Sequence, residues 1–294
     1  MKSICFFSSY FENKNVPYYV KCYITELAHH FDKLVLISIN KNLKIPDIQY
    51  LEINNIEYMP VENEGYDFGM WQKAFNNYPV SEYDRIALVN DSCVLFKKLD
   101  HVFNIINHSN WDYCGILDSM QISYHPQSYF IIINKKAILP VASYFSRNGL
   151  KTEFNDVINT YEVGITKYLL ENNFKIGSVF NNDKCDKNLN PSYYGIKELI
   201  KQGFPFIKKK IIFGNYRNGE IRNLSSTGFD FRPNSYLRII KVTNPENLII
   251  DLSILKKDFS LYNNWLKLFF QAIYWRIYYK SKKIKSYIYR NYIK

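Results

Sequence analysis

Apolar residues along this chain gather in short runs that alternate with longer amphipathic segments. Short apolar runs bounded by polar residues are typical of buried strands, and a 3.6-residue spacing is typical of helices. Strands are predicted over residues 2–8, 33–38, 56–61, 85–89, 113–117 and 129–134, and helices over 17–31, 68–77, 99–107 and 162–172. This alternation predicts an α/β fold with a mainly parallel, mixed sheet and helices on both faces.

Length and composition indicate one large domain followed by a tail. With 294 residues and 47% hydrophobic content, the chain can bury a sizeable core and is not a disordered protein. The clearest change of composition falls near Lys256. We therefore predict one domain over residues 1–255. Residues 256–294 are predicted to form a basic, aromatic helical tail.

The net charge of +11 is concentrated in this tail. Residues 256–294 hold ten of the 38 basic residues and one of the 27 acidic residues, so the rest of the chain is nearly neutral. This disfavours a basic groove through the fold, and we expect no nucleic-acid partner. Basic residues interleaved with aromatic ones favour an anionic membrane surface as partner, and packing of the tail on the domain is the alternative. The aromatic residues concerned are Trp265, Phe269, Phe270, Trp275, Tyr278 and Tyr279.

Cysteine usage and hydropathy point to the cytoplasm. The five cysteines are scattered without a CxxC pair, which disfavours a zinc site and a disulfide framework. The apolar run over residues 4–7 has no cleavage-site pattern, so it is interpreted as a strand and not as a signal peptide. No uncharged apolar stretch approaches the length of a membrane-spanning helix. We therefore expect a cytoplasmic protein that is peripheral on the inner face of the cell membrane.

Asn90, Asp91 and Ser92 follow the predicted strand over residues 85–89. A carboxylate at the end of a parallel strand can bind a ribose hydroxyl, or hold a divalent cation that bridges a nucleotide diphosphate. The alternative is that these residues only form a turn. Asp91 lacks the second acid of an Asp-x-Asp pair, because Cys93 occupies that position.

The segment NEGYDFGMWQKAF, residues 63–75, opens a predicted helix and contains two glycines. Glycine allows positive φ and a close approach of the backbone to a ligand. Asn63 and Asp67 could then hydrogen-bond a base and a ribose beside the helix N-terminus. The alternative is an ordinary strand-to-helix loop with Asp67 as the N-cap.

Three further groups carry candidate chemistry. Glu162 is predicted to open a helix, where a carboxylate either stabilises the helix N-terminus or acts as a general base. His125 has no second histidine at metal-ligand spacing, so it is either a substrate contact or a loop residue. The lysines at 208–210 could neutralise a diphosphate, although such a run is commonly a solvated face.

Several blocks in the same order resemble the rhamnan synthesis F family of bacterial polysaccharide glycosyltransferases. The resemblance runs from about Phe6 to Phe213. Its blocks are NEGYDFGMWQKAF, VNDS, HPQSYFIIINKKAI, YEVGITKYLLENNFKI and NPSYYGIKELIKQGFPFIKK. The first is similar to the family's N-x-GYDFG-x-W-x-x-A block, and the third to its H-x-QSYF segment. Tyr193 departs from the family's Asn-Pro-(Ser/Thr)-His, so no role of that histidine is transferred.

The resemblance implies a GT-A-like fold and the transfer of a sugar, such as a deoxyhexose, from a nucleotide diphosphate sugar to a glycan hydroxyl. It also implies a nucleotide-binding half over about residues 1–110 and an acceptor half over about 111–255. It places the donor among Asn63, Gly65, Asp67, Asn90, Asp91 and Ser92. The acceptor side is assigned to Asp118, His125, Gln127 and Ser128. Glu162 would remove the acceptor proton, and Asp91, with or without Mg²⁺ or Mn²⁺, would hold the departing diphosphate.

Two other functions stay open at this point. A sugar-phosphate transferase on a related scaffold would release a nucleoside monophosphate in place of a diphosphate. A catalytically inactive scaffold that binds a glycan or a membrane is the second alternative. It stays open because Cys93 and Val163 replace the second acids beside Asp91 and Glu162.

Overall fold

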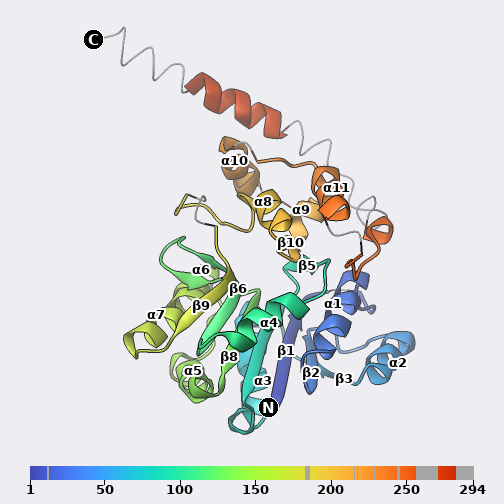
Figure 1. The fold of residues 1–294 in the computed structure, drawn as a ribbon, viewed down its shortest axis with the longest axis vertical. Helices are drawn as coiled ribbons and strands as arrows, with labels where there is room; N and C mark the ends of the chain where they lie inside the picture. Colours follow the sequence, from blue (N-terminus) through green and yellow to red (C-terminus); the bar gives the residue numbers. More distant parts are fainter. Residues whose placement is uncertain are drawn as a thin grey trace.

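An eight-stranded mixed sheet forms the centre of the molecule (Figure 1). The computed structural model describes residues 1–11, 13–182, 186–214, 216, 218–227, 229–243, 246–255 and 271–282. The strands of the sheet are β1 (Ser3–Ser9), β2 (Lys33–Ser38), β3 (Ile56–Pro60), β4 (Arg85–Asn90), β6 (Tyr113–Ser119), β7 (His125–Pro126), β8 (Phe130–Asn134) and β9 (Ile176–Phe180). Their order is β3-β2-β1-β4-β8-β6, and β7 and β9 both pair with β6.

Most neighbouring strands run parallel, which confirms the predicted mainly parallel, mixed sheet. β1 is parallel to β2 and β4, β2 to β3, and β6 to β9, whereas β8 runs antiparallel between β4 and β6. Ser8 of β1 lies opposite Asn90 of β4, and Val89 lies opposite Phe130 of β8. The carboxyl ends of β1 and β4 and the amino end of β8 therefore meet at one edge of the sheet.

Helices cover both faces of the sheet, as predicted. One hydrophobic core contains residues of α1 (Tyr18–Ala28), α2 (Ile45–Ile53) and α4 (Asp100–His108). The other contains residues of α3 (Tyr66–Asn77), α5 (Lys135–Asn148) and α7 (Gly164–Glu171). Alternate β1 side chains enter the two cores, Cys5 the first and Phe6 the second. Burial on both faces explains why these strands are continuous apolar runs in the sequence.

The helix predicted to begin at Glu162 begins earlier, so that prediction was wrong. A short helix, α6 (Phe154–Val157), continues into the π-helical segment η2 (Ile158–Val163) and then into α7. Glu162 thus lies inside a continuous helical run and does not cap a helix N-terminus. The Asn, Asp, Val and Thr residues of the first turns are weak helix formers, which concealed the true start.

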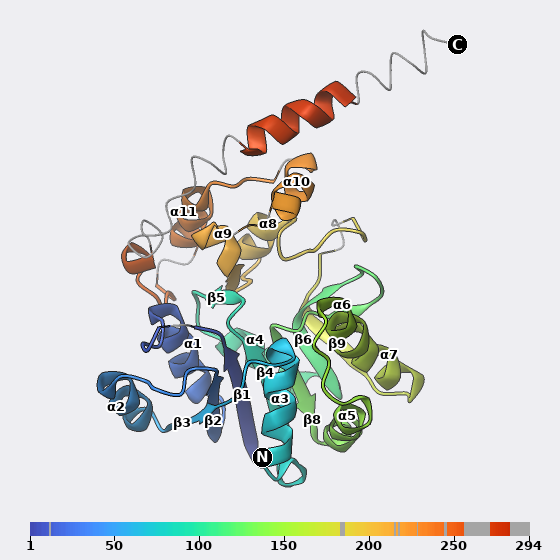
Figure 2. The same ribbon diagram turned by 180° about the vertical axis from the view of Figure 1, so that it is seen from behind.

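Smaller elements stand over the carboxyl edge of the sheet (Figures 1 and 2). Strands β5 (Cys93–Leu95) and β10 (Phe206–Lys208) form an antiparallel ribbon. The helices of this layer are α8 (Ile196–Lys201), α9 (Lys209–Phe213), α10 (Asn218–Ser226) and α11 (Pro233–Thr243). Outside this layer, a 3₁₀ turn, η1 (Val80–Glu82), precedes β4. Buried residues of this layer, such as Phe206 and Ile240, belong to the same core as α1.

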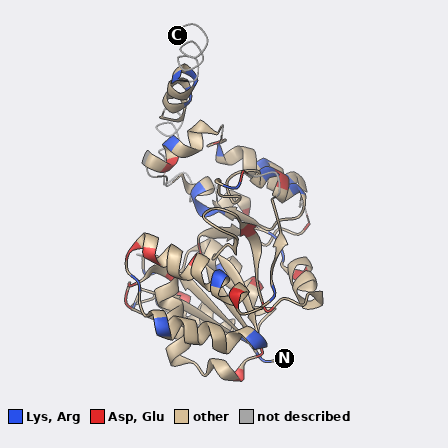
Figure 3. Cartoon of the chain, turned by 90° about the vertical axis from the view of Figure 1, so that its left-hand side faces the viewer, with Lys and Arg blue, Asp and Glu red and all other residues tan. Residues whose placement is uncertain are grey.

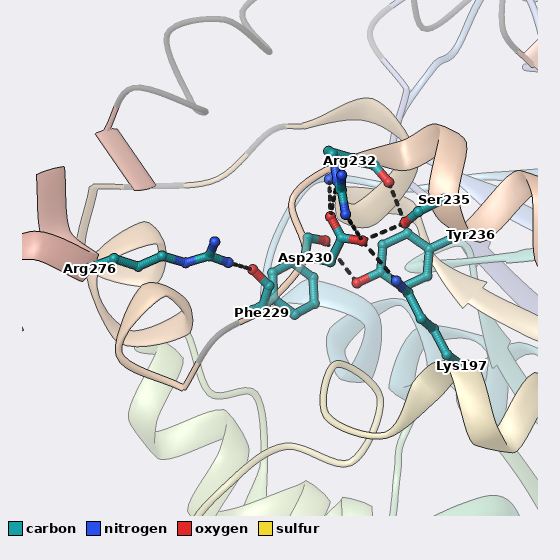
Figure 4. A network of polar contacts seen from close by, with 7 residues as sticks. All are labelled: Lys197, Phe229, Asp230, Arg232, Ser235, Tyr236 and Arg276. Carbon is teal, nitrogen blue, oxygen red and sulfur yellow. Dashed lines mark hydrogen bonds and ion pairs between the residues drawn. The ribbon is translucent and has the colours of Figure 1, made fainter. Parts of the chain in front are cut away.

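A network around Asp230 connects two helices of this layer (Figure 4). The Asp230 carboxylate accepts hydrogen bonds from Lys197 Nζ at 2.7 Å and from Ser235 Oγ at 2.7 Å. Arg232 donates from its backbone N–H and its Nε to Oδ1 of Asp230, at 3.0 and 2.9 Å. Asp230 therefore joins α8 to the start of α11.

The described part of the tail is a helix over residues 271–282. It carries basic residues and no acidic ones, whereas both signs are interspersed over the rest of the chain (Figure 3). Arg276 Nη2 donates to the carbonyl of Phe229 at 2.5 Å, and Arg222 Nε of α10 donates to Tyr279 at 3.0 Å. The predicted aromatic positions 265, 269 and 270 lie outside the described residues. Every helix within the described residues is too short or too polar to span a bilayer.

Candidate functional site

Asp67 lies at the meeting point of β1, β4 and the first turn of α3. Its Oδ1 accepts a hydrogen bond from Ser8 Oγ at 3.0 Å, and its Oδ2 accepts one from Asn90 Nδ2 at 2.8 Å. Ser8 and Asn90 are partners in the β1–β4 register, so the sheet brings both donors to the same carboxylate. Burial, followed by the nearby charge of Asp91, raises the pKa of Asp67 to about 7.

The loop before α3 is shaped by its glycines. Gly65 precedes the helix with a φ of 72°, a conformation that favours glycine, and a Cβ there would lie 2.5 Å from Leu150 Cδ1. The backbone at Gly65 therefore packs closely against another loop of the protein. This packing accounts for a glycine at the position, and no bound ligand is needed to explain it. Asp67 makes no N-cap hydrogen bond, and Asn63 is exposed in the same loop. Asn63 is thus the predicted donor residue in this loop that faces solvent.

Asp91 is a buried carboxylate with three donors on one oxygen. Its Oδ2 accepts hydrogen bonds from Ser9 Oγ at 3.1 Å, Tyr19 OH at 2.8 Å and Lys209 Nζ at 2.9 Å. Lys209 Nζ also donates to Tyr19 OH at 3.2 Å. The Asp91 side chain is 8% exposed and that of Lys209 is 31% exposed, so Lys209 is the more exposed partner of the pair.

The β5–β10 ribbon places Lys208 beside Ser92, and the next residue, Lys209, at the Asp91 carboxylate. Lys208 lies opposite Cys93 in the ribbon, and the backbone N–H of Lys209 donates to the carbonyl of Ser92 at 2.9 Å. Lys208 Nζ donates to Ser92 Oγ at 3.3 Å and stands 4.4 Å from the centre of the Tyr129 ring. Two members of the lysine run, Lys208 and Lys209, therefore lie at the candidate site and are only partly exposed, which favours the first of the two interpretations.

Glu162 forms a second polar cluster with Ser128 and His125. Its Oε1 accepts hydrogen bonds from Ser128 Oγ at 2.9 Å and from the Ser128 backbone N–H at 3.3 Å. His125 Nε2 lies 3.9 Å from the same oxygen, while Nδ1 is 2.9 Å from the carbonyl of Ser123. The π-helical turn projects Glu162 toward the residues that precede β8; such turns are frequent at functional sites.

The two clusters lie at the same edge of the sheet. The backbone N–H of Asn90 donates to the carbonyl of Tyr129 at 3.1 Å, which places Ser128 next to the end of β4. Phe68, beside Asp67, stacks on Tyr161, beside Glu162, with ring centres 5.4 Å apart. The structure thus brings most of the predicted donor and acceptor residues to one region.

Gln127 and Asp118 are less exposed to a substrate than predicted. Gln127 is buried, donates to Asn190 Oδ1 at 3.0 Å and accepts a hydrogen bond from Ser192. Both of its amide atoms are therefore used inside the protein, where they fix the loop around residue 190. Asp118 is partly buried on β6, opposite Pro126 of β7.

A divalent cation does not fit the side chains around Asp91. The Lys209 ammonium already provides a cation for the Asp91 carboxylate, and both oxygens of Asp67 accept hydrogen bonds. Among the described residues no group of three His, Cys, Asp or Glu side chains could hold a metal ion. The arrangement therefore gives no support to Asp91 as a metal ligand.

Sequence reasoning missed Ser8, Ser9 and Tyr19. The two serines had a usable signal, because they end an apolar strand at the edge where such sheets bind ligands. Tyr19 had none, because a tyrosine near the start of an amphipathic helix looks like a core residue.

In open α/β sheets ligands commonly bind beyond the carboxyl ends of the parallel strands, and Asp91 directly follows β4 at that edge. The family model described as rhamnan synthesis protein F matches residues 34–227, more than half of the chain. The chain belongs to the rhamnan synthesis protein F family, which confirms the resemblance found in the sequence.

Among characterised proteins, the chain is similar to the virulence protein VirA of Vibrio anguillarum. The two are 28% identical over a region that covers 52% of this chain and 61% of VirA. The chain thus spans about six-tenths of the length of the curated relatives it matches.

Two solved structures share parts of the fold. A protein described as a nucleotide-diphospho-sugar transferase from Desulfovibrio desulfuricans G20 is 14% identical, with a TM-score of 0.41 over 62% of this chain and 81% of that one. A cytidylyltransferase from Leptospira borgpetersenii is 12% identical, with a TM-score of 0.39 over 83% of this chain and 95% of that one. Similarity at this level says nothing about the activity of this chain.

Proposed function

We propose that this protein is a glycosyltransferase that moves a hexosyl unit, a deoxyhexose such as rhamnose, from a nucleotide diphosphate sugar to a bacterial surface polysaccharide. The observation that supports this most is the arrangement of Asp67, Asp91 and Glu162 around one edge of the sheet. Two carboxylates there suit a donor nucleotide, and a third suits an acceptor hydroxyl. Family membership supports the same class of reaction.

The donor side is assigned to the ends of β1 and β4. Asn63, exposed before α3, would contact the base, and Asp67 would accept a hydrogen bond from the ribose while Ser8 and Asn90 hold it. Asp91 and the residues beside it would face the diphosphate. We also propose that residues 1–110 form the nucleotide half and 111–255 the acceptor half of one domain.

Glu162 is assigned as the general base. In the transfer, the acceptor oxygen forms a bond to C1 of the sugar, the bond between C1 and the phosphate oxygen breaks with its electron pair on the diphosphate, and Glu162 receives the acceptor proton. Ser128 orients the carboxylate through its hydroxyl and backbone N–H. His125, 3.9 Å away, would stabilise the charge of Glu162 or bind the acceptor.

The identity of the nucleotide that is released distinguishes this function from the alternatives. The full chain is incubated with a panel of UDP-, GDP-, CDP- and dTDP-sugars, and the products are resolved by ion-exchange chromatography. We expect slow donor hydrolysis that releases a nucleoside diphosphate. Release of a monophosphate would indicate a sugar-phosphate transferase, and a protein that neither binds nor cleaves any donor would be an inactive scaffold.

We also propose that residues 256–294 bind the anionic inner surface of the cell membrane, so that the enzyme works there on a glycan or lipid-linked acceptor. The charge of this segment supports the proposal, as do the exposed Tyr274 and Ile277 of its described helix, each 62% exposed. Basic residues near an anionic leaflet contribute about 1 kcal/mol each.

A further inference from the structure

We propose that the Lys209 ammonium, held against Asp91, supplies the positive charge that binds the donor diphosphate, in the place that a divalent cation would take. This inference rests on the proposed function, since it concerns the same donor. It predicts a transfer reaction that needs no added metal ion. It also makes Lys209 a substrate-binding residue of the site.

The position of the ammonium supports this role. An ammonium has three N–H donors, and Lys209 uses two of them on Asp91 Oδ2 at 2.9 Å and Tyr19 OH at 3.2 Å. Its side chain is more exposed than the carboxylate beneath it. The third N–H is therefore available to a phosphate oxygen that approaches from the solvent side.

Asp91 then has a different function from that of a metal ligand. A buried carboxylate fixes the ammonium at one point, and Tyr19 and Ser9 fix the carboxylate. A divalent cation on the same oxygen would meet the repulsion of Lys209 within a few ångströms. Lys209 thus neutralises Asp91 and leaves little electrostatic attraction for a divalent cation.

The three consecutive lysines, Lys208 to Lys210, have different partners in the fold. Lys208 lies over Tyr129 and reaches Ser92, on the same side as Lys209. Lys210 instead pairs with Glu220 of α10. Lys208 ends β10 and Lys209 begins α9, so the donor site brings together residues that are far apart in the sequence.

The charge arithmetic of the reaction fits this arrangement. When the bond between C1 and the phosphate oxygen breaks, the electron pair stays on the diphosphate and its charge becomes more negative by one. A preorganised ammonium in a partly buried site stabilises that developing charge without reorganising. Lys209 transfers no proton in this step.

Calorimetric binding of nucleoside diphosphates to the full chain tests the inference. UDP, GDP, CDP and dTDP are titrated in EDTA and, separately, in Mg²⁺ or Mn²⁺. We expect the preferred diphosphate to bind with the same affinity in both buffers, within about threefold. Lys209→Gln should weaken binding by about tenfold to a hundredfold, the range for a hydrogen bond to a charged group. Lys209→Arg should recover part of the loss, and the matched control Lys210→Gln should bind like the wild type.

The outcomes separate this inference from the proposed function. If a diphosphate binds only with Mg²⁺ or Mn²⁺, or binds Lys209→Gln as tightly as the wild type, the role of Lys209 is wrong and the glycosyltransferase proposal stands. If no diphosphate binds in any buffer, the proposed function and this inference both fail. Should Lys209→Gln not fold, the wild-type comparison of EDTA with metal still decides the question.

Discussion

The carboxylate of Asp91 and the ammonium of Lys209 are 2.9 Å apart, although 118 residues separate them in the sequence. The pair joins the end of β4 to the start of α9, and so it connects the central sheet with the layer above it. An unpaired buried carboxylate is costly, and the ammonium, with the hydroxyls of Ser9 and Tyr19, offsets part of that cost. The pair is therefore both a link in the fold and the charged centre of the proposed donor site.

Asp91→Asn should weaken the donor site while leaving the fold intact. The amide keeps an oxygen for Tyr19 and Ser9 but loses the charge that positions Lys209. We expect kcat/KM for the donor to fall by about tenfold to a hundredfold, with the melting temperature within a few degrees of wild type. Steady-state kinetics and thermal unfolding measure the two effects. Unchanged kinetics would remove Asp91 from the mechanism.

Glu162→Gln should lower turnover and spare donor binding. Glutamine is nearly isosteric and still accepts the hydrogen bond from Ser128, but it cannot take a proton. Positioned proton transfer contributes about 10²–10⁴-fold, so kcat should fall by that order. Glu171→Gln, an exposed change at the end of α7, is the matched control and should keep full activity. If kcat of Glu162→Gln stays within a few-fold of wild type, Asp118 is the next candidate base.

The sheet and the edge that carries the site could be predicted because both depend on local pattern. Apolar runs such as that of β1 predict strands, and parallel strands place their ends at one edge. The contact between Tyr19 and Lys209 could not be predicted, since it depends on how a ribbon 190 residues away folds back. The start of the helix around Glu162 was missed because weak helix formers occupy its first turns.

Asp67→Asn should change how stability depends on pH. The pKa of Asp67 is raised from 3.8 to about 7, so the native state holds a proton that the unfolded state has lost between these pH values. Wild-type stability should therefore fall as pH rises over this range, by at most about 1.4 kcal/mol per pH unit. Asparagine does not titrate, so it removes this pH dependence. The stability of the variant relative to wild type should therefore increase as pH rises to 7. Urea unfolding at several pH values measures the difference, and parallel pH profiles would contradict the assignment.

Asp230→Asn should destabilise the protein at neutral pH and much less in acid. Burial alone would raise the pKa of Asp230, but hydrogen bonds from Arg232, Lys197 and Ser235 outweigh it and hold the pKa well below the ordinary 3.8 (Figure 4). The stability from this network is complete above that ordinary value and is lost as pH falls through the folded-state pKa. We expect a loss of about 1–2 kcal/mol at pH 7, because solvent screens part of the network. Arg232→Gln changes a mostly exposed side chain, so it should lower the free energy of unfolding by less than Asp230→Asn does. An equal loss at pH 3 and pH 7 would show that the charge of Asp230 is not the cause.

The final prediction concerns membrane binding by the tail. Tyr274 and Ile277 are each 62% exposed on the helix over residues 271–282, whereas Arg276 of the same helix contacts the Phe229 carbonyl. Two apolar side chains at an interface contribute roughly 1 kcal/mol each. The double variant Tyr274→Ser, Ile277→Ser should therefore bind phosphatidylglycerol vesicles roughly thirtyfold more weakly in a sedimentation assay. Val242→Ser, at a 71% exposed position of α11, should bind like the wild type.

A chain that ends at Lys256 distinguishes membrane binding from packing of the tail on the domain. If the tail binds the membrane, this shortened chain should stay folded, keep its activity on a soluble acceptor and lose binding to anionic vesicles. The contacts of Arg276 and Tyr279 with the layer above the sheet are few and partly exposed, so their loss should cost little stability. A shortened chain that aggregates or unfolds would instead mean that the tail completes the core, and the membrane proposal would fail.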